Sequence, residues 1–128
     1  MMITVPISTG ELLDKMTILQ IKLERISDAG KKSNVSRELK ELLQVREENQ
    51  LHSPELETMV LDLKKINESL WDIEDRIREK EAEQKFDNEF TELARAVYIT
   101  NDKRAAVKKS INVLTGSALV EEKSYKGS

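Results

Sequence analysis

Polar side chains that could do chemistry interrupt an apolar helical repeat near the C-terminal end of the chain. Thr100 and Arg104 occupy adjacent positions of a seam whose other members are apolar. Those apolar members are Phe90, Leu93, Val97, Val107, Ile111 and Leu114. Asn101, Lys108 and Arg95 belong to the same helical stretch, and guanidinium or ammonium groups there could bind a carboxylate or a phosphate. The ligand-binding candidates are therefore Thr100, Asn101, Arg104, Lys108 and Arg95.

The interrupted seam admits three interpretations. In the first, Thr100 and Arg104 form a buried polar layer that fixes the register of the helices. In the second, the helix bends or lies at an edge, and both side chains are solvent-exposed. In the third, they line an anion-binding or catalytic cleft. A buried arginine needs acceptors, because an unpaired buried charge is costly, and the predicted partners are Asn67 with Glu68 or Glu74.

The acidic residues do not combine into a metal site. The only histidine, His52, falls in a predicted loop, where we expect it to be solvated. The pairs Glu38–Glu41, Glu89–Glu92 and Glu11–Asp14 each match half of the carboxylate pattern of helical magnesium-dependent pyrophosphatases, but in the wrong order. The chain contains no cysteine, which excludes a disulfide framework and a thiolate site. We therefore predict no metal and no cofactor.

A small helical mutase of the chorismate type is one enzymatic alternative. Such enzymes surround a dicarboxylate with inward arginine and lysine side chains. Arg95, Arg104 and Lys108 could supply these cations, together with Lys15 or Arg25 from an earlier helix. The ordered cation pattern of those enzymes is absent, and nucleophilic catalysis lacks both a cysteine and a Gly-x-Ser-x-Gly turn. The balance leans away from an enzyme.

Four amphipathic helices are predicted to position these side chains. Apolar residues recur at helical spacing over about residues 9–28, 35–48, 54–83 and 87–116. The last two helices are separated by only a few residues, so they should form a long antiparallel hairpin, with the first two helices packed along it. The chain is 35% charged and 4% aromatic, a composition typical of long helices. The predicted fold is an all-α helical bundle built on this hairpin, with coiled-coil-like packing.

Capping residues mark where the predicted helices begin and end. Ser8 or Thr9 should cap the first helix, Gly30 should end it, and Asn34 and Ser53 should cap the next two.

Residues 1–128 are predicted to form a single domain. Within it, residues 1–8 alternate apolar and polar types and include a proline, which predicts an extended arm. Residues 117–128 have no periodicity, which predicts a mobile tail.

Charge and apolar content favour self-association over other partners. The net charge of −3 conceals −7 over residues 53–92 and +4 over residues 93–128, which suits antiparallel helices that attract each other. The net negative charge of the whole chain argues against nucleic-acid binding. Leu13, Ile18 and Ile21 lie off the seam of the first helix and are predicted to hold a homo-oligomer, with a dimer favoured. No run is long enough to span a membrane and no secretory signal is recognisable, so we expect a cytoplasmic protein.

These observations favour a self-associating helical interaction or scaffold module. The alternative function is that of a small helical enzyme or ligand-binding protein, acting on an anionic small molecule that carries a carboxylate or a phosphate.

Four segments of the chain resemble an uncharacterised helical family of bacteria and phages, a domain of unknown function. These segments are VPISTGELLDKMTILQIKLERI, INESLWDIED, ARAVYITNDKRAAVKKSIN and GSALVEEKSY. The resemblance implies that the polar runs ISTGELLDK, TNDKRAAVKK and EEKSY belong to the pattern of that family. It brings no activity, substrate or cofactor, and whether the three runs form one site is a separate question about this chain.

Overall fold

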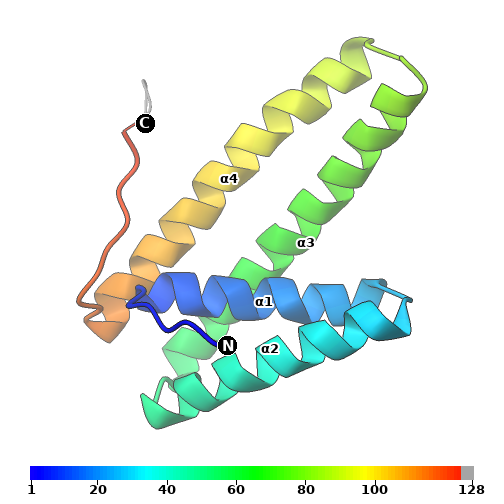
Figure 1. The fold of residues 1–128 in the computed structure, drawn as a ribbon. Helices are drawn as coiled ribbons and strands as arrows, with labels where there is room; N and C mark the ends of the chain where they lie inside the picture. The colour runs from blue at the N-terminus through cyan, green and yellow to red at the C-terminus, as the bar shows by residue number, and fades with distance from the viewer. Residues whose placement is uncertain (125–128) are drawn as a thin grey trace.

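Four α-helices make up the fold in the computed structural model, which describes residues 1–124 (Figure 1). They are α1 (Thr9–Arg25), α2 (Ala29–Glu48), α3 (Pro54–Ala82) and α4 (Asn88–Thr115), and the described part of the chain contains no strand. The predicted all-α helical bundle is confirmed. Its coiled-coil-like packing stays a prediction.

Short polar side chains fix where the helices begin. The Ser8 hydroxyl accepts a hydrogen bond from the Glu11 N–H, and the Ser53 hydroxyl accepts one from the Leu56 N–H, so both predicted N-caps are confirmed. These bonds satisfy donors that have no partner within the helix. At the other end of the chain, Gly116 closes α4 in the left-handed conformation, with φ of 64°.

The boundary between the first two helices differs from the prediction. α1 ends at Arg25 and α2 already begins at Ala29, so neither the Gly30 end nor the Asn34 cap is correct. Asp28 is the N-cap, because its carboxylate accepts a hydrogen bond of 2.8 Å from the Lys31 N–H. The residues that follow contain no proline, and a helix started at this carboxylate continues through them without interruption.

The helices form a hairpin with a third helix laid across its base. α3 and α4 run antiparallel beside each other, and α1 crosses them near the end where α3 begins (Figure 1). α1 contacts all three other helices, whereas α2 packs mainly on α1. The expectation that both of the first two helices lie along the hairpin is therefore wrong for α2. α1 separates α2 from the hairpin because α1 carries apolar residues on more than one face.

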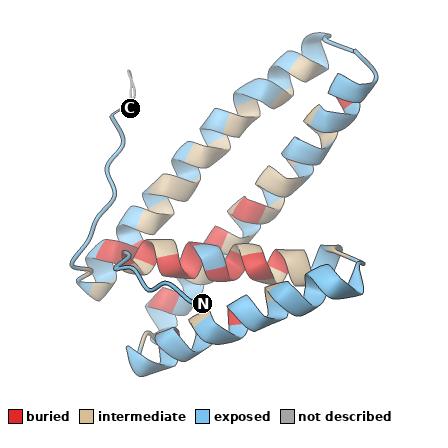
Figure 2. Ribbon diagram, in the orientation of Figure 1, coloured by how far each residue is buried: buried red, intermediate tan, exposed pale blue. Residues whose placement is uncertain are grey.

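The core lies around α1 and the base of the hairpin, where Figure 2 shows most of the buried residues. Its buried members are Leu12, Leu13, Met16, Leu19, Leu39, Leu56, Leu63 and Ile111. Leu13 and Ile21 are 0% and 1% exposed, and Ile18 is partly buried. The predicted dimer contact is thus wrong for Leu13 and Ile21, which other helices of the same chain cover, and stays a prediction for Ile18.

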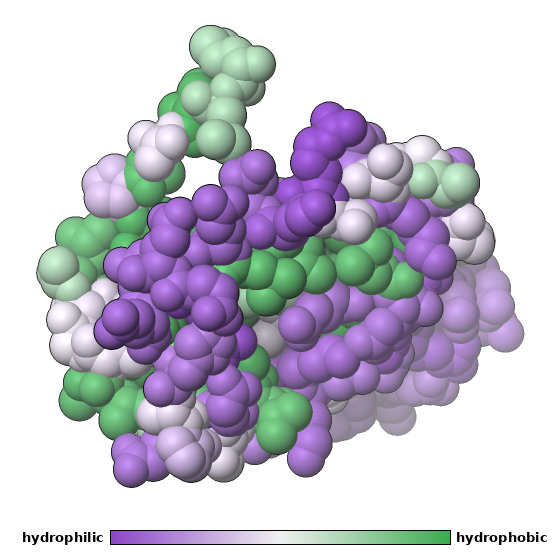
Figure 3. Space-filling model, turned by 90° about the horizontal axis from the view of Figure 1, so that it is seen from below, coloured by the Kyte–Doolittle hydropathy of each residue, from purple (hydrophilic) through white to green (hydrophobic). Residues whose placement is uncertain are grey.

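Both ends of the chain are non-helical. Residues 1–7 project from the body as an exposed, largely apolar arm (Figure 3). Residues 117–124 turn back beside α4, where Lys109 pairs with Glu122 and Asp102 pairs with Lys123. The predicted mobility of the 117–128 tail stays a prediction, and its last four residues lie outside the described part. Over residues 1–124, no helix is both long enough and apolar enough to cross a membrane.

Candidate functional site

The first turn of α1 lies in direct contact with the last turns of α4. A Cβ atom on Gly10 would lie 2.6 Å from the carbonyl oxygen of Lys108, so only glycine permits this approach. The Gly10 N–H donates to Asn112 Oδ1 at 2.7 Å, and the Thr9 N–H donates to Ser117 Oγ at 3.1 Å. The Thr9 and Gly10 N–H groups at the start of α1 are therefore bound by Ser117, which lies just beyond α4, and by Asn112 within it.

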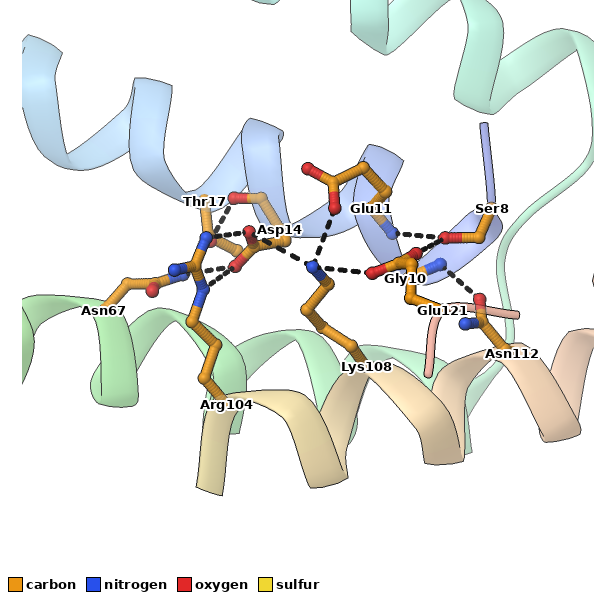
Figure 4. A network of polar contacts seen from close by, with 10 residues as sticks. All are labelled: Ser8, Gly10, Glu11, Asp14, Thr17, Asn67, Arg104, Lys108, Asn112 and Glu121. Carbon is orange, nitrogen blue, oxygen red and sulfur yellow. Dashed lines mark hydrogen bonds and ion pairs between the residues drawn. The ribbon is translucent and has the colours of Figure 1, made fainter. Parts of the chain in front are cut away.

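A buried carboxylate, Asp14, lies at the centre of a polar network that joins α1, α3 and α4 (Figure 4). Arg104 binds both of its oxygens through two guanidinium nitrogens, with Nε 2.9 Å from Oδ1. The amide nitrogen Nδ2 of Asn67 donates hydrogen bonds to Asp14 Oδ1 and to Thr17 Oγ1, each 2.9 Å long. Thr17 Oγ1 in turn donates to the Asp14 carbonyl at 2.8 Å. One acidic side chain thus connects three helices.

The partner of Arg104 differs from the predicted one. Its acceptor is Asp14 of α1 and not Glu68 or Glu74 of α3. The hydrogen bond to Asp14 raises the pKa of Arg104 above its ordinary value, although partial burial opposes this. The antiparallel pairing of α3 and α4 correctly places Asn67 near Arg104, but α1 crosses there and supplies the nearer carboxylate.

Lys108 lies one helical turn after Arg104 and is surrounded by carboxylates. Its Nζ is 2.7 Å from Glu11 Oε2, 2.9 Å from Glu121 Oε2 and 4.0 Å from Asp14 Oδ2. Burial opposes protonation of this amine, but the hydrogen bonds to Glu11 and Glu121 outweigh burial and raise the pKa of Lys108. Lys108 therefore stays charged and attaches both α1 and the tail to α4.

The remaining sequence candidates are distributed differently. Asn101 and Arg104 border a groove of about 420 Å³ between α1 and the hairpin, together with Ile18, Trp71 and Glu74. Thr100 is half-buried. The Arg95 side chain is 60% exposed and lies 3.8 Å from Glu92, so Arg95 does not belong to the network.

The sequence interpretation missed the acidic half of the network. In the sequence, Glu11 and Asp14 stand out only as half of a carboxylate pattern and Glu121 only as part of the tail, and neither feature points to the cations of α4. One signal could have found Asp14. It follows Leu12 and Leu13 and precedes Met16 by two residues, so it lies within the most apolar stretch of the first helix. A carboxylate at such a position needs a cationic partner.

The network is close to charge balance, and both of its cations are paired with carboxylates. Three carboxylates, those of Glu11, Asp14 and Glu121, surround the two cations Arg104 and Lys108. Among the described residues, no buried side-chain nitrogen or oxygen lacks a hydrogen-bond partner. Residues 1–124 also contain no group of three acidic or histidine side chains that could hold a metal ion. The arrangement fastens α1, α3, α4 and the tail together.

Comparison with known proteins places the chain in a family but gives no activity. No curated protein and no solved structure matches the chain. A family model does match, over residues 3–128, and it bears out the resemblance seen in the four sequence segments. The chain therefore belongs to the family described as "Family of unknown function (DUF6165)".

Proposed function

We propose that this chain is a single-domain, self-associating interaction module of the cytoplasm, in which two copies exchange their N-terminal arms. The arm, residues 1–7, is the observation that carries the proposal. Its large apolar residues are Met1, Met2, Ile3, Val5 and Ile7, and each of them is at least 40% exposed. Apolar residues gathered on one exposed segment mark an interaction surface.

A groove beside the arm offers a place for the arm of a second copy. It measures about 410 Å³ and includes Leu12, Val45 and Leu51 in its walls, next to Val5 and Ile7 at the base of the arm. Because arm and groove are neighbours in one copy, a two-fold axis close to both brings each arm onto the other groove. Such an interface is closed and stops at a dimer.

The polar network supports a structural role in this module. Arg104 is bound on both carboxylate oxygens of Asp14, which is 0% exposed, so Arg104 is not free to receive an anionic substrate. The groove next to it has mixed charge, since Glu74 and Asp75 line it together with Arg78. A small enzyme acting on a carboxylate or phosphate, the alternative from the sequence, finds less support than an interaction module.

Sedimentation equilibrium of the full chain tests the proposal. We expect the wild type to show twice the mass of one chain at micromolar to millimolar concentration. The double variant Ile3→Asp, Val5→Asp should be monomeric, because carboxylates on the arm would lose hydration against the apolar wall residues Leu12, Val45 and Leu51. Circular dichroism should show unchanged helix content, since the arm lies outside the four helices.

The matched control is Leu61→Asp, at an apolar residue of α3 that is 60% exposed and distant in sequence from the arm. This variant should remain a dimer. A wild type that stays monomeric at millimolar concentration would refute self-association. A dimer that survives the arm variant but not Leu61→Asp would refute arm exchange and move the interface to α3.

A further inference from the structure

Ionic contacts hold the C-terminal segment 119–124 beside α4. Glu121 pairs with Lys108, Glu122 with Lys109 at 3.4 Å, and Lys123 with Asp102 at 2.7 Å. Leu119 and Val120, the large apolar residues of this segment, are 46% and 43% exposed. Exposed ion pairs contribute little to stability and are weakened by salt. The Glu122–Lys109 pair is of this exposed kind, whereas the Glu121–Lys108 pair is partly buried.

Glu121 differs from its neighbours because it occupies a built site. Its carboxylate accepts a hydrogen bond from the hydroxyl of Ser8, a residue that is only 3% exposed, and it lies 2.9 Å from Lys108 Nζ. Burial disfavours the charged carboxylate, but the bonds from Ser8 and Lys108 outweigh burial and lower the pKa of Glu121. This position therefore stabilises a negative charge despite the acidic residues around it.

The Glu121 side chain also borders a cavity. A cavity of about 270 Å³ lies between the base of the arm and the tail, and its lining includes Ile7, Ser8, Val120 and Glu121. When residues 119–124 leave, the Ser8 hydroxyl loses its acceptor and Lys108 loses one of its carboxylates. Of these two groups, Ser8 lines the cavity together with Glu11, whereas Lys108 lies outside its lining and 2.9 Å from the Glu121 carboxylate.

We propose that Ser8 and Lys108 form a binding site for an external carboxylate, and that Glu121 occupies this site as an internal substitute. A singly charged carboxylate fits better than a phosphate, because Glu11 lies 2.7 Å and Asp14 4.0 Å from the same Lys108 nitrogen. Repulsion from these two acids rises with the charge of the ligand. The carboxylate can come from a small organic acid or from the tail of a second copy.

Acetate titration of Glu121→Ala tests the site in the full chain. We expect saturable NMR shifts at the Ser8 and Thr9 amides and at the Lys108 ammonium, with sodium chloride of equal ionic strength as reference. Wild-type protein should need at least tenfold more acetate for half-saturation, because Glu121 competes. Glu122→Ala is the matched control. It removes the neighbouring ion pair to Lys109, keeps Glu121, and should respond like the wild type.

The double variant Glu121→Ala, Lys108→Met should lose the acetate response while circular dichroism shows retained helix. If this double variant unfolds, Glu121→Ala with Lys108→Arg keeps the charge and should still respond. A Glu121→Ala variant that responds no more than Glu122→Ala overturns the proposal. These shifts do not depend on the arm, so adding Ile3→Asp and Val5→Asp to Glu121→Ala should leave them unchanged whether or not arm exchange is correct.

The source of the carboxylate is tested with two chains. Isotope-labelled Glu121→Ala is mixed with unlabelled Lys108→Met, which keeps an intact tail but lacks half of the site. Shifts at Ser8 of the labelled chain identify the second copy's tail as the ligand. An acetate response without such shifts assigns the site to small organic acids. Absence of both responses refutes the site.

Discussion

At the scale of single residues, the Asp14–Arg104 pair is the contact most sensitive to substitution. Arg104→Met leaves the Asp14 carboxylate, which is 0% exposed, without its main partner. We expect a loss of about 3 kcal/mol in the free energy of unfolding. Asp14→Asn should cost less, about 2 kcal/mol, because the Arg104 side chain is 29% exposed and can reach water. Urea denaturation of the two variants measures the difference.

Removing both charges should be less harmful than removing one. The double variant Asp14→Leu, Arg104→Met leaves no unpaired buried charge, so it should be more stable than Arg104→Met alone. Single-variant costs that simply add in the double variant would contradict this account of the pair and would indicate independent packing effects.

Gly10 is the second sensitive position. Gly10→Ala places a Cβ atom 2.6 Å from the Lys108 carbonyl oxygen and 3.0 Å from Asn112 Oδ1, so α1 must move away from α4. We expect a loss of about 2 kcal/mol or more, measured by thermal or urea unfolding. Gly30→Ala is the control, because its Cβ would meet only Asp28 Oδ1 at 3.3 Å and α2 gains helix propensity. A Gly10→Ala protein as stable as Gly30→Ala would mean that the two helices are not in contact.

At the scale of elements, the turn between α3 and α4 is held by a cluster of charges. Lys80 lies 2.7 Å from Asp87 Oδ2 and 3.4 Å from Glu89 Oε2, and Asp87 Oδ1 also caps α4 through the Phe90 N–H. The hydrogen bond from Lys80, followed by that from Phe90, lowers the pKa of Asp87. Arg76 first, and then Lys80, lower the pKa of Glu89. Both carboxylates therefore favour the folded turn when they are ionised.

The sign of the resulting pH dependence follows from these lowered values. The stabilisation is complete above the ordinary carboxyl pKa of about 4, and it is lost as the pH falls through the lowered folded-state values. We expect Asp87→Asn to melt a few degrees below the wild type at pH 7, and the difference to vanish near pH 2. Asp87→Ala should melt lower still at pH 7, because it also loses the cap. A gap that widens as the solution is acidified would contradict the ion pair.

The positions of the helices could be predicted from the sequence better than the contacts between them. The helix starts at Ser8 and Ser53 could be predicted, because N-capping is a local interaction between residues three apart. Asp28 was missed because Gly30, which usually ends helices, follows it by two residues. The pairing of Arg104 with Asp14 spans 90 positions of the chain, and helical periodicity carries no information about contacts over such a separation.

At the scale of the whole molecule, burial is unequal between the two ends of the hairpin. Between residues 68 and 110, all of which are described, Lys80 is the one buried residue, whereas α1 contains eight. Local opening requires less free energy where fewer side chains are buried. We therefore expect backbone amides of residues 73–97 to exchange with deuterium faster than those of α1, measured by mass spectrometry at neutral pH. Equal protection along α3 and α4 would contradict this and would point to a partner covering the hairpin.

The placement of α1 is also the part of the fold that periodicity could not supply. Leu13, Ile18 and Ile21 correctly indicated that the first helix needs more than one neighbour. For Leu13 and Ile21, which are buried, those neighbours are other helices of the same chain. A stripe of leucine and isoleucine has the same sequence pattern whether it packs within one chain or between two chains, because both kinds of burial are driven by the hydrophobic effect.

The contacts of α1 with α4 also determine when this chain can fold during its synthesis. Gly10 is bound by Asn112, Asp14 by Arg104 and Ser8 by Glu121, so these α1 contacts join residues 90 to 113 positions apart. A ribosome makes residues 8–14 long before residues 104–121 leave its exit tunnel. Until then α1 has only α2 and α3 to pack against, and its buried carboxylate has no guanidinium. The hairpin of α3 and α4 depends on local contacts and can form quickly, but the core closes only after α4 has emerged.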